Sequence, residues 1–180
     1  MRDADLGLKN TIWFYSTAVD AVIIDQLTKF LARAHLIEGK AVPIISGVLD
    51  WRLAHNTGAA FGMLPDWAPL FILIGLVAIF AIVRLRTLRG ASLGLSIGLG
   101  LLLGGALGNL IDRLAFPGQG VTDFIDLTVK LSGYQWPTFN FADVAIVAGA
   151  IIVLFRVYVI EKRQTDDEHI DNEERSQTEG

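Results

Sequence analysis

Acidic and amide side chains gather between residues 104 and 143, where one long apolar segment ends and another begins. Ionisable side chains beside membrane-length apolar runs are costly to keep there, so each is a candidate for function. The polar stretches read GGALGNLIDRL (104–114), GVTDFIDL (120–127) and WPTFNFAD (136–143), and their ionisable residues are Asp112, Arg113, Asp123, Asp126 and Asp143. We interpret this region as an active site at a membrane surface.

Two of these carboxylates could perform acid–base chemistry together. Carboxylates that share a site cannot both ionise at low cost, so one keeps its proton near neutral pH. One group can then activate water while the other protonates a leaving amine. This is the chemistry of aspartic peptide hydrolysis, which needs no metal and no cofactor. A carboxylate at the start of a helix would be the more readily ionised member of such a pair, because a helix N-terminus favours negative charge.

The polar residues at the end of the third apolar segment also have a simpler explanation. Asn109, Asp112 and Arg113 stand at i, i+3 and i+4, so they share one face of a helix. Taken alone, an Asp–Arg pair there could serve only to anchor the helix end at the membrane surface.

The same holds for the residues that follow. Asn140 and Asp143 fit an N-cap and an acidic third residue of the fourth apolar helix. Asp123 and Asp126 fall in the segment that connects two apolar runs, which we expect to be a loop with solvated carboxylates. The combination of all these groups at one interface is what favours an active site.

Other chemistries fit less well. GLSIG at 94–98 matches G-x-S-x-G, but it lies inside an apolar span and not at a strand-to-helix turn. The three histidines form no H-E-x-x-H zinc motif. The absence of cysteine excludes thiolate nucleophiles and disulfides. There is no glycine-rich phosphate loop, and no basic cluster with interleaved aromatic residues suggests a nucleic-acid partner.

The composition is that of a small membrane protein. Of the 180 residues, 52% are hydrophobic and 19% are charged, against about 25% charged in soluble domains, and the mean hydropathy is +0.48. The apolar residues form four runs, so we predict an all-α fold with four transmembrane helices in one domain, 1–160. The predicted spans are about 11–30, 67–83, 91–111 and 141–160. The acidic tail 161–180 lacks apolar periodicity, and we expect it to be disordered.

The first span is the weakest of the four, because Asp20 and Asp25 interrupt it. A cleaved signal peptide is the alternative interpretation. Against it stand those carboxylates, the acidic residues at 3 and 5, and the lack of a clear cleavage site. We therefore predict a retained helix.

Two features bear on packing. In 48–56, apolar and polar residues alternate roughly with period two, which predicts a strand. A small sheet lying on the membrane surface would fit, with Trp51 and Trp67 at the headgroups. In the third span, Gly100, Gly104 and Gly108 line one helical face, where small side chains allow close helix–helix approach.

Positive charge sets the expected orientation. The short RLRTLRG turn at 84–90 is dense in arginine, which favours its side as cytoplasmic. Both termini would then be cytoplasmic, and the cluster at 104–143 would lie at the outer face.

Five blocks of the sequence resemble one known family, the lipoprotein signal peptidases (bacterial signal peptidase II). The blocks are DQLTK (25–29), HNTGAAFG (55–62), GGALGNLIDRL (104–114), VTDFID (121–126) and FNFAD (139–143). They stand in the family's order and extend from the first span to the fourth, and the core blocks show no departure. The resemblance implies four helices, an external cradle of strands and cytoplasmic termini.

The resemblance also implies a substrate and residue roles. The substrate would be a prolipoprotein whose cysteine carries diacylglycerol, cleaved just before that cysteine at the outer leaflet of the bacterial inner membrane. The catalytic pair would be Asp123 and Asp143. Asn56, Asn109, Arg113 and Asn140 would line the site, and Asp25, Lys29, Asp112 and Gly58 would support it. No metal or cofactor is implied, the antibiotic globomycin would occupy the same site, and we expect a monomer in contact with membrane lipid.

Two other classes of function remain as alternatives. A small transporter or proton-relay subunit would use acids near the middle of the membrane, and Asp20 and Asp25 are its best support. A helper of lipoprotein maturation without catalytic activity would require the aspartates to be dispensable.

Overall fold

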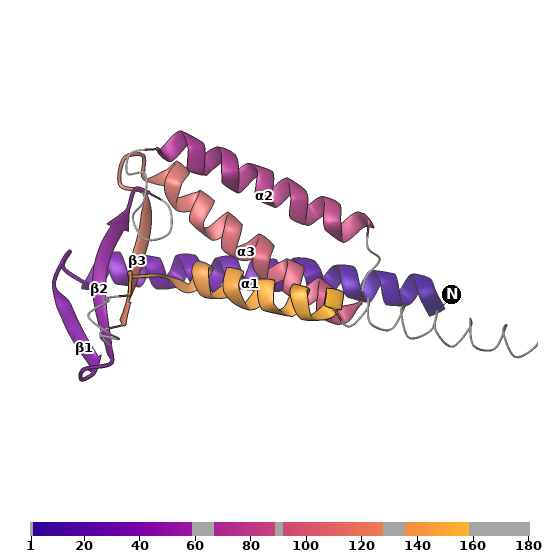
Figure 1. The fold of residues 1–180 in the computed structure, drawn as a ribbon, viewed down its shortest axis with the longest axis horizontal. Helices are drawn as coiled ribbons and strands as arrows, with labels where there is room; N and C mark the ends of the chain where they lie inside the picture. The colour runs from indigo at the N-terminus through magenta and orange to yellow at the C-terminus, as the bar shows by residue number, and fades with distance from the viewer. Residues whose placement is uncertain (1, 59–66, 89–91, 128–135, 159–180) are drawn as a thin grey trace, which may run out of the picture.

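The computed structural model describes residues 2–58, 67–88, 92–127 and 136–158, which are the coloured parts of Figure 1. Within these ranges, four helices pack side by side and a small sheet lies across one end of the bundle (Figure 1). The helices are α1 (Arg2–His35), α2 (Ala68–Leu88), α3 (Leu93–Ala115) and a fourth, unlabelled helix, Phe141–Tyr158. The predicted disordered tail, 161–180, lies outside the described residues.

Three of these helices, α2, α3 and Phe141–Tyr158, are long and apolar enough to cross a membrane. A helix thus lies at each of these three predicted spans, and that the helices cross a membrane stays a prediction. Helix α1 is longer than predicted but is not among them, since charged side chains interrupt its apolar run. Two of those charges, Asp25 and Lys29, have no exposed surface. Its crossing of the membrane therefore stays a prediction.

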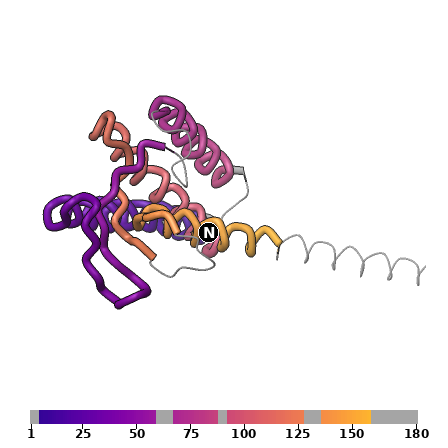
Figure 2. The backbone as a smooth tube through the Cα atoms, turned by 60° about the vertical axis from the view of Figure 1, so that its left-hand side comes forward, coloured from indigo at the N-terminus to yellow at the C-terminus, as the bar shows by residue number. Residues whose placement is uncertain are grey.

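The sheet contains three antiparallel strands in the order β1 (Ala41–Ile45), β2 (Leu49–Asn56) and β3 (Val121–Leu127). The strand predicted at 48–56 is confirmed as β2. Figure 2 shows the β1–β2 hairpin extending away from the ends of the helices. The sheet therefore forms a platform at one end of the bundle, with β3 nearest to the helices.

The predicted loop around Asp123 and Asp126 is wrong, because both residues lie on β3. Neither carboxylate is solvated: Asp123 is 2% exposed and Asp126 is fully buried. The strand is buried on both faces, so its sequence lacks the alternation that would have revealed it. Arg52 on β2 pairs with Asp126 at 2.8 Å and compensates its charge.

The glycine face of α3 packs as predicted. A β-carbon on Gly100 would lie 2.6 Å from the carbonyl oxygen of Phe14, and one on Gly104 would lie 2.7 Å from that of Ala18. The backbones of α1 and α3 therefore approach so closely that only glycine fits. Ser96, the serine of the GLSIG match, is fully buried within α3, which agrees with a structural helix and not a nucleophile elbow.

Candidate active site

A pocket of about 320 Å³ lies where the sheet meets the helices. Asp123 on β3 and Asp143 in the first turn of Phe141–Tyr158 both line it. The antiparallel pairing of β2 with β3 brings Asn56 to the same pocket, and the last two turns of α3 supply Asn109 and Arg113. Five of the predicted site residues, distant in sequence, thus share one cavity.

Asp123 is held by two amides. The Nδ2 of Asn140 donates to its Oδ1 at 2.6 Å, and the Nδ2 of Asn56 donates to its Oδ2 at 3.3 Å. The orientation of the Asn56 amide is fixed in turn, because its Oδ1 accepts the backbone N–H of Gly58 at 3.1 Å. Gly58, predicted as a supporting residue, therefore contacts the site through Asn56, and its supporting role stays a prediction.

Asp143 sits in a reciprocal cap at the start of its helix. The backbone N–H of Asp143 donates to the Oδ1 of Asn140 at 3.0 Å, and the backbone N–H of Asn140 donates to the Oδ2 of Asp143 at 3.2 Å. The predicted N-cap is thus present. The cap also orients the Asn140 amide. Because the Oδ1 of Asn140 is held in the cap, the Nδ2 of Asn140 points toward Asp123.

The surroundings of Asp123 favour its protonated form. Burial, followed by the nearby charge of Asp143, raises the pKa of Asp123 from 3.8 to about 7. Hydrogen bonds from Asn140 and Asn56 oppose this rise, because they stabilise the carboxylate. Near neutral pH, Asp123 is therefore present in both its protonated and its charged form.

A buried charge cluster lies behind the pocket, between α1 and α3. The ammonium of Lys29 contacts Asp25 at 2.9 Å, Asp112 at 3.4 Å and the Oδ1 of Asn109 at 2.9 Å. All three charged side chains have no exposed surface. Asn109 directs its Nδ2 to the Oδ1 of Asp143 at 2.9 Å, so this amide links the cluster to one of the pocket carboxylates.

Each carboxylate of this cluster also holds the backbone next to a pocket aspartate. The Oδ1 of Asp25 accepts the N–H of Ala142 at 2.9 Å, one residue before Asp143. The Oδ2 of Asp112 accepts the N–H of Thr122 at 2.8 Å, one residue before Asp123. Lys29 contacts both, so one buried cation ties together the two backbone positions that carry the pocket carboxylates.

Arg113 lines the pocket one helical turn after Asn109 on α3. Its guanidinium donates to the carbonyl oxygens of Gly58 and Asn109, each at 3.3 Å, and lies 5.4 Å from the ring centre of Phe71 on α2. Asp112, although predicted on the same helical face as Arg113, turns toward α1 and does not line the pocket. The supporting role expected for Asp112 stays a prediction.

Several residues of the site region were not singled out from the sequence. Gln26 donates to Asp25, Asp112 and the carbonyl oxygen of Gly108, all within 3.2 Å. Arg33 donates to the hydroxyl of Thr122 at 2.8 Å. Gln26 stands inside the DQLTK block, one turn before Lys29, and that position was the only available signal for its role.

Apolar helices combined with two carboxylates in one pocket fit one class of protein, the membrane-bound aspartic peptidases. The family described as signal peptidase (SPase) II matches residues 17–159. A lipoprotein signal peptidase of Acinetobacter baumannii is 39% identical over 86% of this chain and 88% of its own length. One from Moorella thermoacetica is 40% identical over 80% of this chain and 91% of its own.

A solved structure gives the same result. A bacterial membrane enzyme, determined by the in meso method, superposes with a TM-score of 0.73 at 32% identity, covering 81% of this chain and 87% of its own. The chain therefore belongs to the signal peptidase II family, and it is an aspartic peptidase of the membrane.

Proposed function

We propose that this enzyme removes the signal peptide from diacylglyceryl-modified prolipoproteins, cleaving just before the lipidated cysteine. Its family and its relatives, which are named lipoprotein signal peptidases, support the substrate class. The observation that supports the chemistry is that Asp123 and Asp143 line one pocket and are bridged by Asn140.

In the proposed mechanism, Asp143 is the base and Asp123 the acid. The carboxylate of Asp143 takes a proton from water as the water oxygen bonds to the scissile carbonyl carbon. The proton of Asp123 passes to the carbonyl oxygen, which leaves a neutral tetrahedral diol. When the C–N bond breaks, Asp143 gives its proton to the leaving amine and a diol hydroxyl returns a proton to Asp123. Both groups are then ready for another cycle.

The amides keep these roles apart. Asn109 and the N–H of Asn140 both donate to Asp143, which stabilises it as a carboxylate. Burial favours the neutral form of Asp123, as its raised pKa indicates. Arg113 lines the same pocket and carries donors that could steady the oxyanion or the substrate backbone. No metal or cofactor takes part in this scheme.

We further propose an orientation in the membrane. Four spans would place both termini in the cytoplasm and the pocket at the outer leaflet of the inner membrane. In support, α1 begins at the end of the bundle opposite the sheet, and Phe141–Tyr158 runs back toward that end (Figure 1). Residues 1–160 would form one peptidase domain, with 161–180 as a cytoplasmic tail. The enzyme would act as a monomer, and globomycin would compete for the pocket.

The transporter alternative is disfavoured by the surroundings of Asp25. A relay acid must exchange protons with water, but Asp25 is fully buried and bound to Lys29 and to the N–H of Ala142. A proton relay through Asp25 would also give no role to Asp123 and Asp143, which line the pocket.

The test is cleavage of a lipidated prolipoprotein by purified Asp123→Asn and Asp143→Asn variants. Each should lose at least about 10⁴-fold in kcat, as other catalytic groups do when removed. Asp20→Asn is the control, since Asp20 lies on the outer surface of α1 and should leave turnover unchanged. Retained turnover in either dyad variant, with normal membrane insertion, would refute the mechanism and favour the helper alternative.

A further inference from the structure

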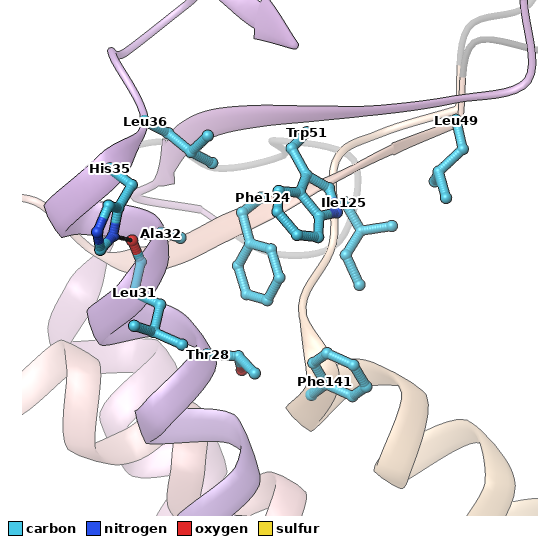
Figure 3. A pocket seen from close by; sticks show the side chains of 10 residues that line it. All are labelled: Thr28, Leu31, Ala32, His35, Leu36, Leu49, Trp51, Phe124, Ile125 and Phe141. Atoms are coloured by element: carbon cyan, nitrogen blue, oxygen red, sulfur yellow. Dashed lines mark hydrogen bonds between the residues drawn. The ribbon is translucent and has the colours of Figure 1, made fainter. Parts of the chain in front are cut away.

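A second and larger cavity, of about 460 Å³, lies beneath the sheet. Figure 3 shows it enclosed by the last turns of α1 on one side, by Trp51 and Phe124 of the sheet above, and by Phe141 below. Its lining is apolar apart from His35, the hydroxyl of Thr28 and the indole nitrogen of Trp51. That hydroxyl is turned back to its own helix, since it donates to the carbonyl oxygens of Ile24 and Asp25.

This cavity is separate from the active-site pocket. Among the described residues, the two share no lining side chain. Strand β3 borders both spaces: Val121 and Asp123 line the catalytic pocket, whereas Phe124 and Ile125 line the apolar cavity.

A second apolar space adjoins this cavity at Phe141, and we call the two spaces together the groove. A smaller apolar hollow of about 190 Å³ lies between α1 and Phe141–Tyr158, and Phe141 lines both spaces. The α1 residues that line the two spaces recur at helical spacing on one face: Ala21, Ile24, Thr28, Leu31, Ala32 and His35. From residue 21 to residue 35, this face is about 21 Å long at 1.5 Å per residue.

The dimensions and the rim of the groove indicate its occupant. One leaflet of a bilayer has a hydrocarbon depth of about 15 Å, half of the roughly 30 Å core, so the groove is long enough for one acyl chain. Its rim is continuous with the outer apolar surface of a membrane protein, since Leu27 on α1 and Val144 on Phe141–Tyr158 are exposed beside it. Trp51 closes the end where the headgroups would lie, as interfacial tryptophans do.

We propose that this groove binds one acyl chain of a bilayer phospholipid, distinct from the substrate's lipid. The chain runs between α1 and Phe141–Tyr158 and ends beneath Trp51. It fills space that the side chains of the described residues leave open, and so it supports the sheet on the bundle. The bound lipid is a structural ligand, and the inference depends on the membrane location alone, not on the catalytic mechanism.

The test uses Trp51 as a local probe. In a parent variant with Trp13, Trp67 and Trp136 replaced by Phe, Trp51 is the only tryptophan. The protein is reconstituted in vesicles of phosphatidylethanolamine and phosphatidylglycerol, with and without bromine near the carbonyl end of one acyl chain. We expect strong quenching of Trp51 by the brominated lipid. Thr28→Phe, which fills the groove, should reduce that quenching to less than half.

The matched control is Leu27→Phe, which adds a ring at the neighbouring position, where the side chain is 55% exposed. It should leave the quenching at the parent value. Ala148→Phe fills the groove at its other end and serves as a second variant, should Thr28→Phe fail to fold. Equal quenching in the parent and in a folded groove-filling variant would refute the proposal.

Native mass spectrometry gives an independent readout. Protein extracted from the same vesicles should keep one phospholipid, and Thr28→Phe should lose it while Leu27→Phe keeps it. Detergent adducts alone, or a dimer in place of the lipid adduct, would overturn the proposal. The catalytic roles are tested separately by Asp123→Asn and Asp143→Asn, which should keep the bound phospholipid while they lose cleavage, so the two proposals can fail independently.

Discussion

The ammonium of Lys29 lies 2.9 Å from the Oδ1 of Asn109, in a part of the bundle where the Lys29 side chain has no exposed surface. A cation can contact only the oxygen of an amide, so this bond fixes which end of Asn109 faces the pocket. The amide nitrogen is thereby directed at Asp143. Lys29 never lines the pocket, but it determines a hydrogen bond made to one of the two carboxylates there.

Replacing Lys29 with Met should therefore reduce both stability and turnover. Asp25 and Asp112 would be left as buried carboxylates without their cation, a change that typically costs about 3–5 kcal/mol. The Oδ1 of Asn109 would keep only the longer hydrogen bond from the Nδ2 of Asn140, at 3.3 Å, so the amide could rotate away from Asp143. We expect a lower Tm in detergent and a lower kcat, with a smaller effect on KM because the pocket wall is unchanged.

A second variant separates the two effects. Asp25→Asn combined with Lys29→Met removes one uncompensated charge, and the new amide oxygen can still accept the N–H of Ala142. This double variant should recover part of the lost Tm but none of the lost kcat, because Asn109 still lacks its cation. Recovery of both together would show that Lys29 acts through stability alone.

The raised pKa of Asp123 predicts the alkaline limit of activity. Asp123 must carry its proton to act as the acid, and its pKa lies at about 7. Turnover should consequently fall as the pH rises through about 7, with a slope of one proton. The check is the pH profile of kcat/KM on a lipidated substrate. A profile that stays flat to well above this pH would contradict the assignment of Asp123 as the acid.

Removing the Asn56 amide should move this limit upward. Its Nδ2 donates to Asp123 at 3.3 Å, and this bond lowers the pKa of that carboxyl group by stabilising its charged form. In Asn56→Leu the pKa of Asp123 should rise, so the alkaline limb shifts to higher pH while the maximal rate falls. A shift to lower pH would show that Asn56 does not bond to the carboxylate.

Asp143→Asn should lower the pKa of Asp123, because it removes the neighbouring negative charge that raises this pKa. Infrared titration of the Asp123 carboxyl group measures the change.

The local features of the fold could be predicted from the sequence, because they depend on neighbours along the chain. The glycine spacing in α3, the cap formed by Asn140 and the alternation in β2 are each contained within a few residues. The placement of Asp123 was not predictable in this way. Strand β3 is recognisable only through its pairing with β2, in which Asp123 stands opposite Ala54, far away in sequence.

The supporting cluster shows the same limit. The bond from the N–H of Ala142 to Asp25 joins residues 117 positions apart, and nothing in the spacing of either segment indicates it. The resemblance to a family identified Asp25, Lys29 and Asp112 as supporting residues without saying what they do. Only the packed bundle shows that they hold the backbone beside the two pocket carboxylates.

The close contact between α1 and α3 gives a prediction about stability that is independent of catalysis. In Gly104→Ala, the added methyl group would lie 2.7 Å from the carbonyl oxygen of Ala18 and 2.6 Å from the β-carbon of Ala21. Both contacts are with the backbone or the first carbon of α1, which cannot rotate away, so the helices must separate. Overpacking of this kind costs about 1–3 kcal/mol, and the Tm in detergent should fall.

Gly7→Ala is the matched control for this change. Gly7 also lies within a helix, but a β-carbon there would meet no atom of the described residues within 4 Å. Alanine at an exposed helical position is favoured over glycine by about 1 kcal/mol, so the Tm should stay equal or rise. Equal losses of Tm in both variants would contradict the prediction. The loss in Gly104→Ala could then not be assigned to the close packing of α3 on α1. A fall in Tm in Gly104→Ala alone would measure the close contact between α1 and α3. The bond from Lys29 on α1 to Asn109 on α3 joins the same two helices.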